Sequence, residues 1–318
     1  MAVSSASPTP GTLADGLAAQ LKSEPSRFQR FARWTWWFFR HKPLGAISAV
    51  VSLLVFVIAI GAWTGLLVPM DPIKVHGADR LLSPFSSSIR GTEYYVLGTD
   101  DLGRDMLSRV IKGAQISVFF SIGVTVISVV IGGVIGLISA YSGGTFDMVV
   151  QRIVDALQTI PFLVLAIAIV SMLGPGLWQG FWAVTITSVP RPARLIRGSV
   201  LSAKENVWAE AARTLGASDR RIMFRHILPN VLAPMIVLAT FILATAVITE
   251  ASLSFLGIGA QPPTPSWGAM LTGSGRLYFE THPFLAFIPG MAISVFVFAT
   301  NMFGDALRDI LDPRLRGR

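Results

Sequence analysis

Long apolar runs separated by shorter polar segments dominate the chain. A helix needs about 20 predominantly apolar residues to cross a hydrocarbon layer about 30 Å thick. Six stretches meet this requirement, although Pro190 and Pro192 interrupt the end of the fourth. The predicted spans are 44–68, 114–140, 150–173, 177–196, 231–257 and 284–304. The pattern therefore predicts an all-α, polytopic membrane protein with six transmembrane helices.

Composition and charge agree with a membrane setting and add an orientation. Hydrophobic residues make up 52% of the chain and charged residues only 14%. Short cytoplasmic loops carry an excess of Lys and Arg. With the N-terminus inside, 19 of the 26 basic residues lie on the cytoplasmic side, whereas the reverse topology leaves seven there. We therefore expect both termini in the cytoplasm, and the net charge of +8 requires no nucleic-acid partner.

The segments between the spans define the expected organisation. The first residues, rich in Ser, Ala, Pro and Gly, are expected to be disordered, and the stretch RFQRFARWTWWFFRHKP suits a helix at the lipid interface. The expected parts are a cytoplasmic region (1–43), the first span (44–68), an extracytoplasmic loop (69–113), a membrane core (114–304) with a cytoplasmic loop (198–230), and a cytoplasmic tail (305–318).

The chain lacks the residues or motifs that disulfides, common metal sites and nucleotide-binding loops require. The chain has no cysteine, which excludes disulfides and thiolate metal sites. Its four histidines, His41, His76, His226 and His282, lie in different segments and form no close ligand motif in the sequence. A G-x-x-x-x-G-K-[ST] phosphate loop is also missing. We therefore predict no catalytic, cofactor or metal site, and expect that any ATP driving this protein is bound by another chain.

One polar stretch stands out between the apolar runs. It is EAARTLGASDRRIMFRHILPN, Glu210 to Asn230. Good helix formers precede Gly216, which can adopt the left-handed conformation that closes a helix. Ser218 is placed to cap a second helix, and Pro229 is expected to mark a new boundary. The stretch therefore predicts two short helices joined by a tight glycine turn.

This stretch resembles the cytoplasmic EAA loop of ABC importer permeases, in which Glu-Ala-Ala is followed by Gly and later by Leu-Pro. The matching residues are Glu210, Ala211, Ala212, Gly216, Leu228 and Pro229. The general pattern has Ile three residues before Pro, where this chain has His226. The end of the stretch, His226 to Asn230, resembles instead the peptide-transporter branch of the family. The resemblance implies a coupling helix that docks in a groove of an ATPase; the two alanines would allow close approach. A solvated linker is the alternative.

Other segments extend the resemblance from about residue 40 to the end. They are LGTDDLGRDMLSRVIKGAQIS (Leu97–Ser117), TEASLSFLGIG (Thr249–Gly259), SWGAML (Ser266–Leu271) and NMFGDALRDILDPRLRGR (Asn301–Arg318). Together they are similar to permeases of dipeptide and oligopeptide importers in the bacterial inner membrane. The resemblance implies the type I importer fold, a related second permease, two ATPase chains, an extracytoplasmic binding protein and a peptide substrate. Nickel and glutathione importers have similar permeases, so the substrate stays open.

Isolated polar residues complete the candidate set. Asp100, Asp101, Arg104 and Asp105 lie in a glycine-rich loop segment. We favour local ion pairs for these residues over direct contact with substrate, and their proximity alone is weak evidence for a metal.

Two polar residues lie within predicted spans. Glu250, in the outer part of the fifth, either braces the helix end or takes part in passage; we favour bracing. Asn301, near the inner end of the last, is expected to form an interhelical hydrogen bond.

Small residues and prolines are expected to shape the helix packing. Gly132 and Gly136 form a G-x-x-x-G step that allows close contact with an unidentified helix. Pro161 can kink the third span.

Two other functions are alternatives to an importer permease. An ATP-independent secondary transporter would be expected to show internal repeats, broken helices and mid-membrane ionisable groups. A membrane scaffold would use the polar loop only for docking.

Overall fold

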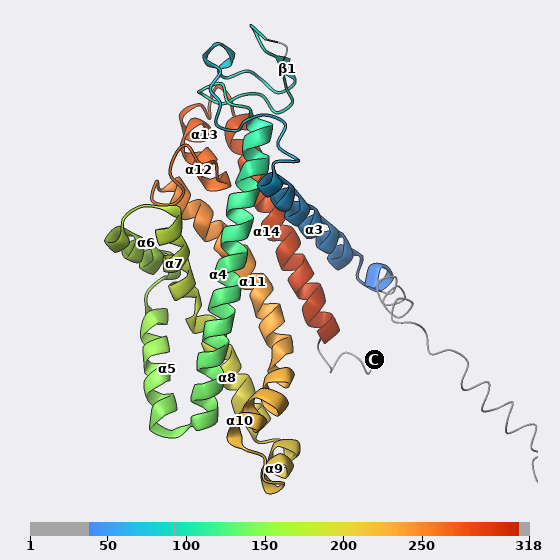
Figure 1. Cartoon of the computed structure of the whole chain (residues 1–318), viewed down its shortest axis with the longest axis vertical. Coiled ribbons are helices and arrows are strands. Elements are labelled where there is room, and N and C mark those ends of the chain that lie inside the picture. Colours follow the sequence, from blue (N-terminus) through green and yellow to red (C-terminus); the bar gives the residue numbers. More distant parts are fainter. Residues whose placement is uncertain (1–37, 92, 312–318) are drawn as a thin grey trace, which may run out of the picture.

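The computed structural model describes residues 38–91 and 93–311. Long helices form an elongated bundle with a loop-rich cap at one end and a small helical hairpin at the other (Figure 1). The expected disordered N-terminal segment, most of the interfacial helix and residues 312–318 of the tail lie outside the described residues.

The elements follow in this order. The first part comprises α3 (Pro43–Thr64), η1 (Gly77–Asp79), β1 (Ser86–Ser87), β2 (Tyr94–Tyr95), α4 (Met106–Ser142), α5 (Gly144–Thr159), α6 (Phe162–Leu173) and α7 (Leu177–Ser188). The second part comprises α8 (Pro190–Lys204), α9 (Val207–Thr214), α10 (Asp219–Arg221), η2 (Ile222–Ile227), α11 (Leu228–Phe255), α12 (Trp267–Thr272), α13 (Ser274–Leu277) and α14 (Phe284–Leu311). The β1–β2 hairpin is antiparallel.

The all-α fold class is confirmed, and most predicted spans correspond to long helices. Within the described residues, four helices are long and apolar enough to cross a membrane: Pro43–Thr64, Met106–Ser142, Asp219–Phe255 and Phe284–Leu311. The second span is longer than the sequence indicated, because the carboxylate of Asp105 caps α4 by accepting the Ser108 N–H.

The third and fourth predicted spans differ from simple helices. Helices α5 and α6 meet at Ile160–Pro161 with a bend of 92°, so the expected kink is a full break, and only the bent pair together qualifies as a span. The stretch 177–196 divides at Val189 into α7 and α8, of 12 and 15 residues, neither long enough to count. Pro190 lacks an N–H, which interrupts the hydrogen-bond ladder there.

Helix α4 is the central column of the bundle, and α8 packs closely along it (Figure 1). A Cβ added to Gly132 would collide with Pro192 and with the Val189 carbonyl oxygen. One added to Gly136 would collide with the Ala193 carbonyl oxygen. The helix facing the G-x-x-x-G step is therefore α8, and the two backbones touch because no side chain separates them.

The two ends of the described chain lie at the same end of the bundle. Lys42, just before α3, forms an ion pair with Asp309 of α14 at 2.5 Å. Gly45 and Ala306 also contact each other across these helices. The β hairpin, α12 and α13 gather at the opposite end (Figure 1). Helices α9 and α10 form the tip of the bundle that is farthest from this β hairpin (Figure 1).

The inside–outside assignment can be tested with single cysteines, because the chain has none of its own. Ser87 in β1 and Ser202 in α8 are both exposed and lie near opposite ends. We expect Ser87→Cys to react with an impermeant thiol reagent in intact cells and Ser202→Cys to react only after permeabilisation. The reverse labelling pattern would contradict the orientation.

Candidate functional site

The EAA-like residues lie in the helical hairpin at the tip of the bundle, where the chain passes from α8 through α9 and α10 to α11. Helix α9 contains Glu210, Ala211 and Ala212, and η2 leads directly into Leu228 and Pro229. The structure therefore brings the predicted motif residues into one compact unit.

The glycine turn after α9 has the conformation that the sequence predicted. Gly216 has φ +77°, in the left-handed region. The Ala217 N–H donates to the Ala212 carbonyl at 3.0 Å, a bond that spans the turn and closes the helix end. Gly216 has no other part of the chain within 4 Å of where a Cβ would lie, so backbone strain alone opposes a larger residue.

Two details after this turn differ from expectation. Ser218 immediately precedes α10, but its side chain makes no capping hydrogen bond. Pro229 does not end the helix, since the chain remains helical from Asp219 to Phe255. The six residues before Leu228 adopt a π-helix, in which the Leu228 N–H donates to the carbonyl of Met223. Pro229 then occupies the first turn of α11, where a missing N–H costs little.

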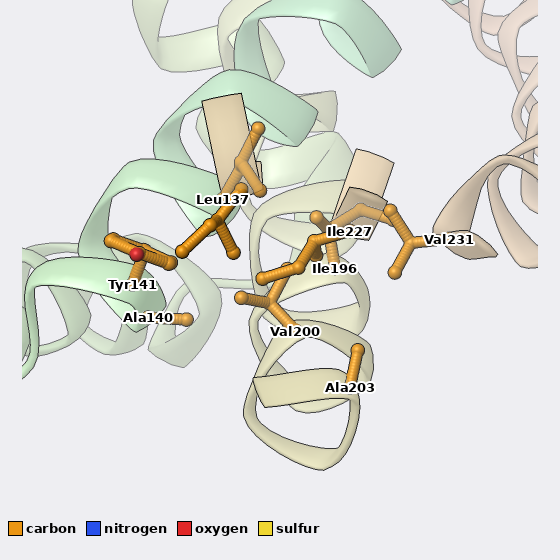
Figure 2. Packing of buried hydrophobic residues seen from close by; sticks show 9 residues of the cluster. Leu137, Ala140, Tyr141, Ile196, Val200, Ala203, Ile227 and Val231 are labelled. Carbon is orange, nitrogen blue, oxygen red and sulfur yellow. The ribbon is translucent and has the colours of Figure 1, made fainter. Parts of the chain in front are cut away.

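A buried apolar cluster fixes the hairpin to the bundle. Figure 2 shows Leu137 and Tyr141 of α4 meeting Ile196 and Val200 of α8 and Ile227 of η2. Ile222 belongs to the same cluster and is fully buried. The hairpin therefore contacts α4 and α8, which come before it in the chain, as well as α11, which follows it.

Polar contacts at the cluster edge strengthen this attachment. The Tyr141 hydroxyl donates to Asp219 Oδ1 at 2.5 Å, joining the end of α4 to α10. Lys204 donates to the Tyr141 carbonyl at 2.7 Å. Above them, Arg197 donates two hydrogen bonds to Asp147 Oδ2 and Oδ1, from Nη2 at 2.6 Å and from Nε at 2.8 Å. A paired guanidinium–carboxylate contact fixes orientation as well as distance.

The outer face of the hairpin carries two large apolar side chains that are almost fully exposed. Val207 and Leu215 are 81% and 88% exposed. Glu210 and Ala211 are also exposed. We call these four residues the tip face. Ala212 instead packs inward against the buried cluster, so only one of the two alanines is available to another protein.

Glu250 lies in α11 and is only 1% exposed. The Ser117 hydroxyl of α4 donates to its Oε2 at 2.7 Å, and the Ser254 hydroxyl donates to its Oε1 at 2.8 Å. The Ser254 oxygen in turn accepts the Ala260 N–H at 3.0 Å. Glu250 therefore links α4, α11 and the following loop, which is the geometry expected of a brace.

The acidic loop segment forms the local ion pairs that we favoured. Asp100 is 1% exposed and contacts Arg104 Nε at 2.7 Å and Arg109 Nε at 3.3 Å. Asp101 lies 3.9 Å from Arg104 Nη2. Asp105 is occupied in capping α4. These carboxylates hold the loop against the start of α4 and do not converge on a shared ligand.

Sequence reasoning missed a second polar cluster in this loop. Asp79 is buried and accepts hydrogen bonds from Ser88 Oγ at 2.6 Å, the Ile89 N–H at 2.8 Å and Tyr95 Oη at 3.1 Å. Burial alone would raise the pKa of Asp79, but these donors outweigh it and hold the pKa below its usual value. Burial and the neighbouring carboxylates raise the pKa of Tyr95. No sequence motif marks this cluster, because its members are separated by irregular chain.

Asn301 does not form the expected interhelical bond with any residue that the structure describes. Its side chain on α14 is only half-buried. A partly exposed amide has no obligatory partner within the chain, and this accounts for the difference.

The geometry defines a polytopic α-helical membrane component with a protruding helical hairpin. A family model described as "Binding-protein-dependent transport system inner membrane component" matches residues 132–317. The chain belongs to this family, and it is a multi-pass protein of the inner membrane.

Individual relatives agree with this assignment. The chain is 40% identical over 294 residues to the di/tripeptide transport system permease protein DppC of Pseudomonas aeruginosa, covering 92% of this chain and 94% of that protein. It is 39% identical over 300 residues to the glutathione transport system permease protein GsiD of Pectobacterium atrosepticum, covering 94% and 97%. Its fold is similar to a chain of the inward-facing MetNI methionine ABC transporter, with a TM-score of 0.55 and 19% identity, covering 65% of this chain and 98% of that chain.

The bracing interpretation of Glu250 predicts a difference between two substitutions. Glu250→Leu leaves the Ser117 and Ser254 hydroxyls without their acceptor, and each unmet buried polar group costs about 1–3 kcal/mol. We therefore expect lower thermal stability and a lower yield of assembled protein. Glu250→Gln retains an acceptor and should keep assembly and most uptake. Normal assembly of Glu250→Gln with a severe loss of uptake would instead place Glu250 in the translocation path.

Proposed function

We propose that this chain is the membrane-spanning permease subunit of an ATP-driven importer, and that the helical hairpin transmits the motion of the ATPase to the membrane helices. The observation that carries the proposal is the tip face: two large apolar side chains exposed on a hairpin that is itself fixed to α4, α8 and α11. An exposed apolar surface of this kind marks a site of protein contact.

The proposed partners follow from the division of labour in such an importer. A second, related permease completes the translocation path, and two separate ATPase chains bind and hydrolyse ATP at the cytoplasmic side. An extracytoplasmic binding protein delivers the substrate. Under this proposal the chain itself is not an enzyme and holds no cofactor, and both of its termini lie in the cytoplasm with the hairpin.

The proposed substrate is a di- or oligopeptide. Support comes from one relative named as a di/tripeptide transport permease and from another named as a glutathione transport permease, since glutathione is itself a tripeptide. A groove of about 630 Å³ between α8 and α11 adds a physical argument. Arg194, Ser199, Asn206 and Asn230 contribute to its lining, and these polar groups suit a hydrated peptide better than lipid tails.

Glutathione import is the second candidate within this class, since the relative that acts on glutathione matches the chain at nearly the same identity. Uptake of labelled dipeptide and labelled glutathione by the assembled transporter separates the two. Failure to transport the dipeptide, glutathione and a labelled longer peptide would contradict the peptide proposal.

If the hairpin transmits the motion of the ATPase to the membrane helices, Gly216→Val should have a specific effect. A β-branched residue at φ +77° is strained, and such strain costs about 1–3 kcal/mol, comparable to a typical coupling free energy of about 1–3 kcal/mol. We expect normal membrane insertion but loss of substrate-stimulated ATP hydrolysis and of uptake in the reconstituted complex.

Matched variants separate coupling from general strain. Gly65 also has φ +77° and no neighbour near a Cβ, but it ends α3 far from the hairpin. Gly65→Val should therefore leave ATPase stimulation intact. Gly216→Asn should retain much of the coupling, because Asn tolerates this conformation. Normal substrate-stimulated ATP hydrolysis and normal uptake with Gly216→Val would refute the proposal that the hairpin transmits the motion of the ATPase.

The tip face predicts a docking defect. Leu215→Asp places a charge where we propose that an apolar side chain is buried against the ATPase. Burial of a Leu side chain contributes about 1.5–3 kcal/mol, so ATPase affinity should fall roughly tenfold or more. Leu277→Asp, at a residue 74% exposed on α13 near the other end, is the control and should leave affinity unchanged. Equal affinities for the two variants in a pull-down titration would contradict docking at this face.

A further inference from the structure

Three potential metal ligands converge in the loop between α3 and α4, apart from the helical hairpin and the groove. His76 precedes η1, Asp79 ends it, and Glu93 precedes β2. One ligand atom from each lies within 4.8 Å of the other two. The loop folds the β hairpin back onto η1, and this brings together residues that are up to 17 positions apart.

Two carboxylates in this cluster share a single phenolic proton. The hydroxyl of Tyr95, a fully buried residue, lies 3.1 Å from Asp79 Oδ2 and 3.0 Å from Glu93 Oε2. A phenol has one proton and can donate it to only one carboxylate at a time. The carboxylate oxygen that does not receive this proton, Asp79 Oδ2 or Glu93 Oε2, therefore faces the phenolic oxygen without a proton between them. A cation shared by the two carboxylates would relieve this repulsion.

The spacing of the ligand atoms suits such a cation. Two ligands at about 2.1 Å from a tetrahedral Zn²⁺ lie about 3.4 Å apart. His76 Nδ1 and Glu93 Oε2 are 3.4 Å apart. The ligand atoms of Asp79 lie within 4.8 Å of the other two, so completing the set requires a closer approach of up to about 1.4 Å. The side chains of His76 and Glu93 are only half-buried and are the ones that would move.

The surroundings provide what a metal site needs beyond its ligands. A cavity of about 270 Å³ adjoins the cluster and has room for the water that would fill the remaining position; Asp71 and Asp105 contribute to its acidic lining. The Ser88 and Tyr95 hydroxyls both contact Asp79 Oδ2, and among the described residues Oδ1 accepts only the Ile89 N–H. Such hydrogen-bond donors are the usual outer partners of metal-bound carboxylates. Lys74 approaches the other Glu93 oxygen, Oε1, at 3.9 Å and is 61% exposed, so it does not compete for Oε2, the oxygen that faces His76 and Tyr95.

We propose that His76, Asp79 and Glu93 bind a divalent transition-metal ion, with Zn²⁺ as the best match to one imidazole and two carboxylates. The ion would join η1 to the β hairpin and so fix the fold of the extracytoplasmic loop. This role is independent of the substrate that the protein transports, and it does not rest on the proposed function.

The test measures Zn²⁺ binding by the full-length chain in lipid nanodiscs, purified with a histidine-free tag and stripped with a chelator. Elemental analysis after gel filtration gives the stoichiometry, and calorimetry gives the affinity. We expect about one ion per chain, and an affinity at least tenfold lower for His76→Ala and for Glu93→Gln. Glu93→Gln keeps the side-chain size and so preserves the loop should His76→Ala prove unstable.

The half-buried His282 provides the matched control, because it lies between α13 and α14 and outside the cluster. His282→Ala should bind Zn²⁺ as the unchanged protein does. X-ray absorption of the loaded wild-type protein should show one nitrogen among oxygen ligands. Equal Zn²⁺ affinities for the wild type and the folded Glu93→Gln variant, or a loss of binding only in His282→Ala, would overturn the proposal.

Discussion

The rest of the structure depends on the close contact between α4 and α8. Gly132 and Gly136 let the backbone of α8 lie directly against α4, and the Arg197–Asp147 pair ties α8 to α5 as well. Lipid supplies little hydrophobic force between helices, so close packing and polar pairs must hold them together. Because α8 leads into the hairpin, this contact determines where the tip face lies relative to the bundle. A side chain at Gly136 would separate the helices and displace the hairpin with them.

The π-helix before Pro229 shows how the second attachment of the hairpin is made. Residues five apart on an α-helix lie about 140° apart around the axis, given 100° per residue. Ile222 and Ile227 are five apart, yet both are fully buried in one cluster. The wider π turn brings them nearer to the same face, since its bonds join residues five apart. It also carries the chain into Pro229 without a break, so α10, η2 and α11 act as one continuous element.

The sequence contains strong information about the apolar spans and the EAA-like turn, but little about contacts between distant segments. Gly216 was predictable because only a few residues adopt positive φ readily. The division of 177–196 at Val189 was not predictable, since a proline can also lie inside a continuous helix, as Pro234 and Pro289 do. The predictions of a Ser218 cap and of an Asn301 hydrogen bond were wrong. The sequence shows that a side chain can form a hydrogen bond, but it does not show which partner the fold brings near it. Likewise, the cluster of His76, Asp79 and Glu93 depends on how an irregular loop folds back, and no periodic pattern specifies that.

The arrangement of these contacts determines how a push on the tip would travel. A displaced α9 can move the membrane helices through α8, which is packed against α4, and through η2, which continues into α11. These two routes meet again near the opposite end, where Glu250 of α11 accepts a hydrogen bond from Ser117 of α4. With α4 and α11 linked at both ends, by the apolar cluster below and by Glu250 above, sliding of one helix along the other would break buried contacts at both sites. The easier response is for the two helices to tilt together, and this favours rigid-body rocking of the bundle over local distortion of either helix.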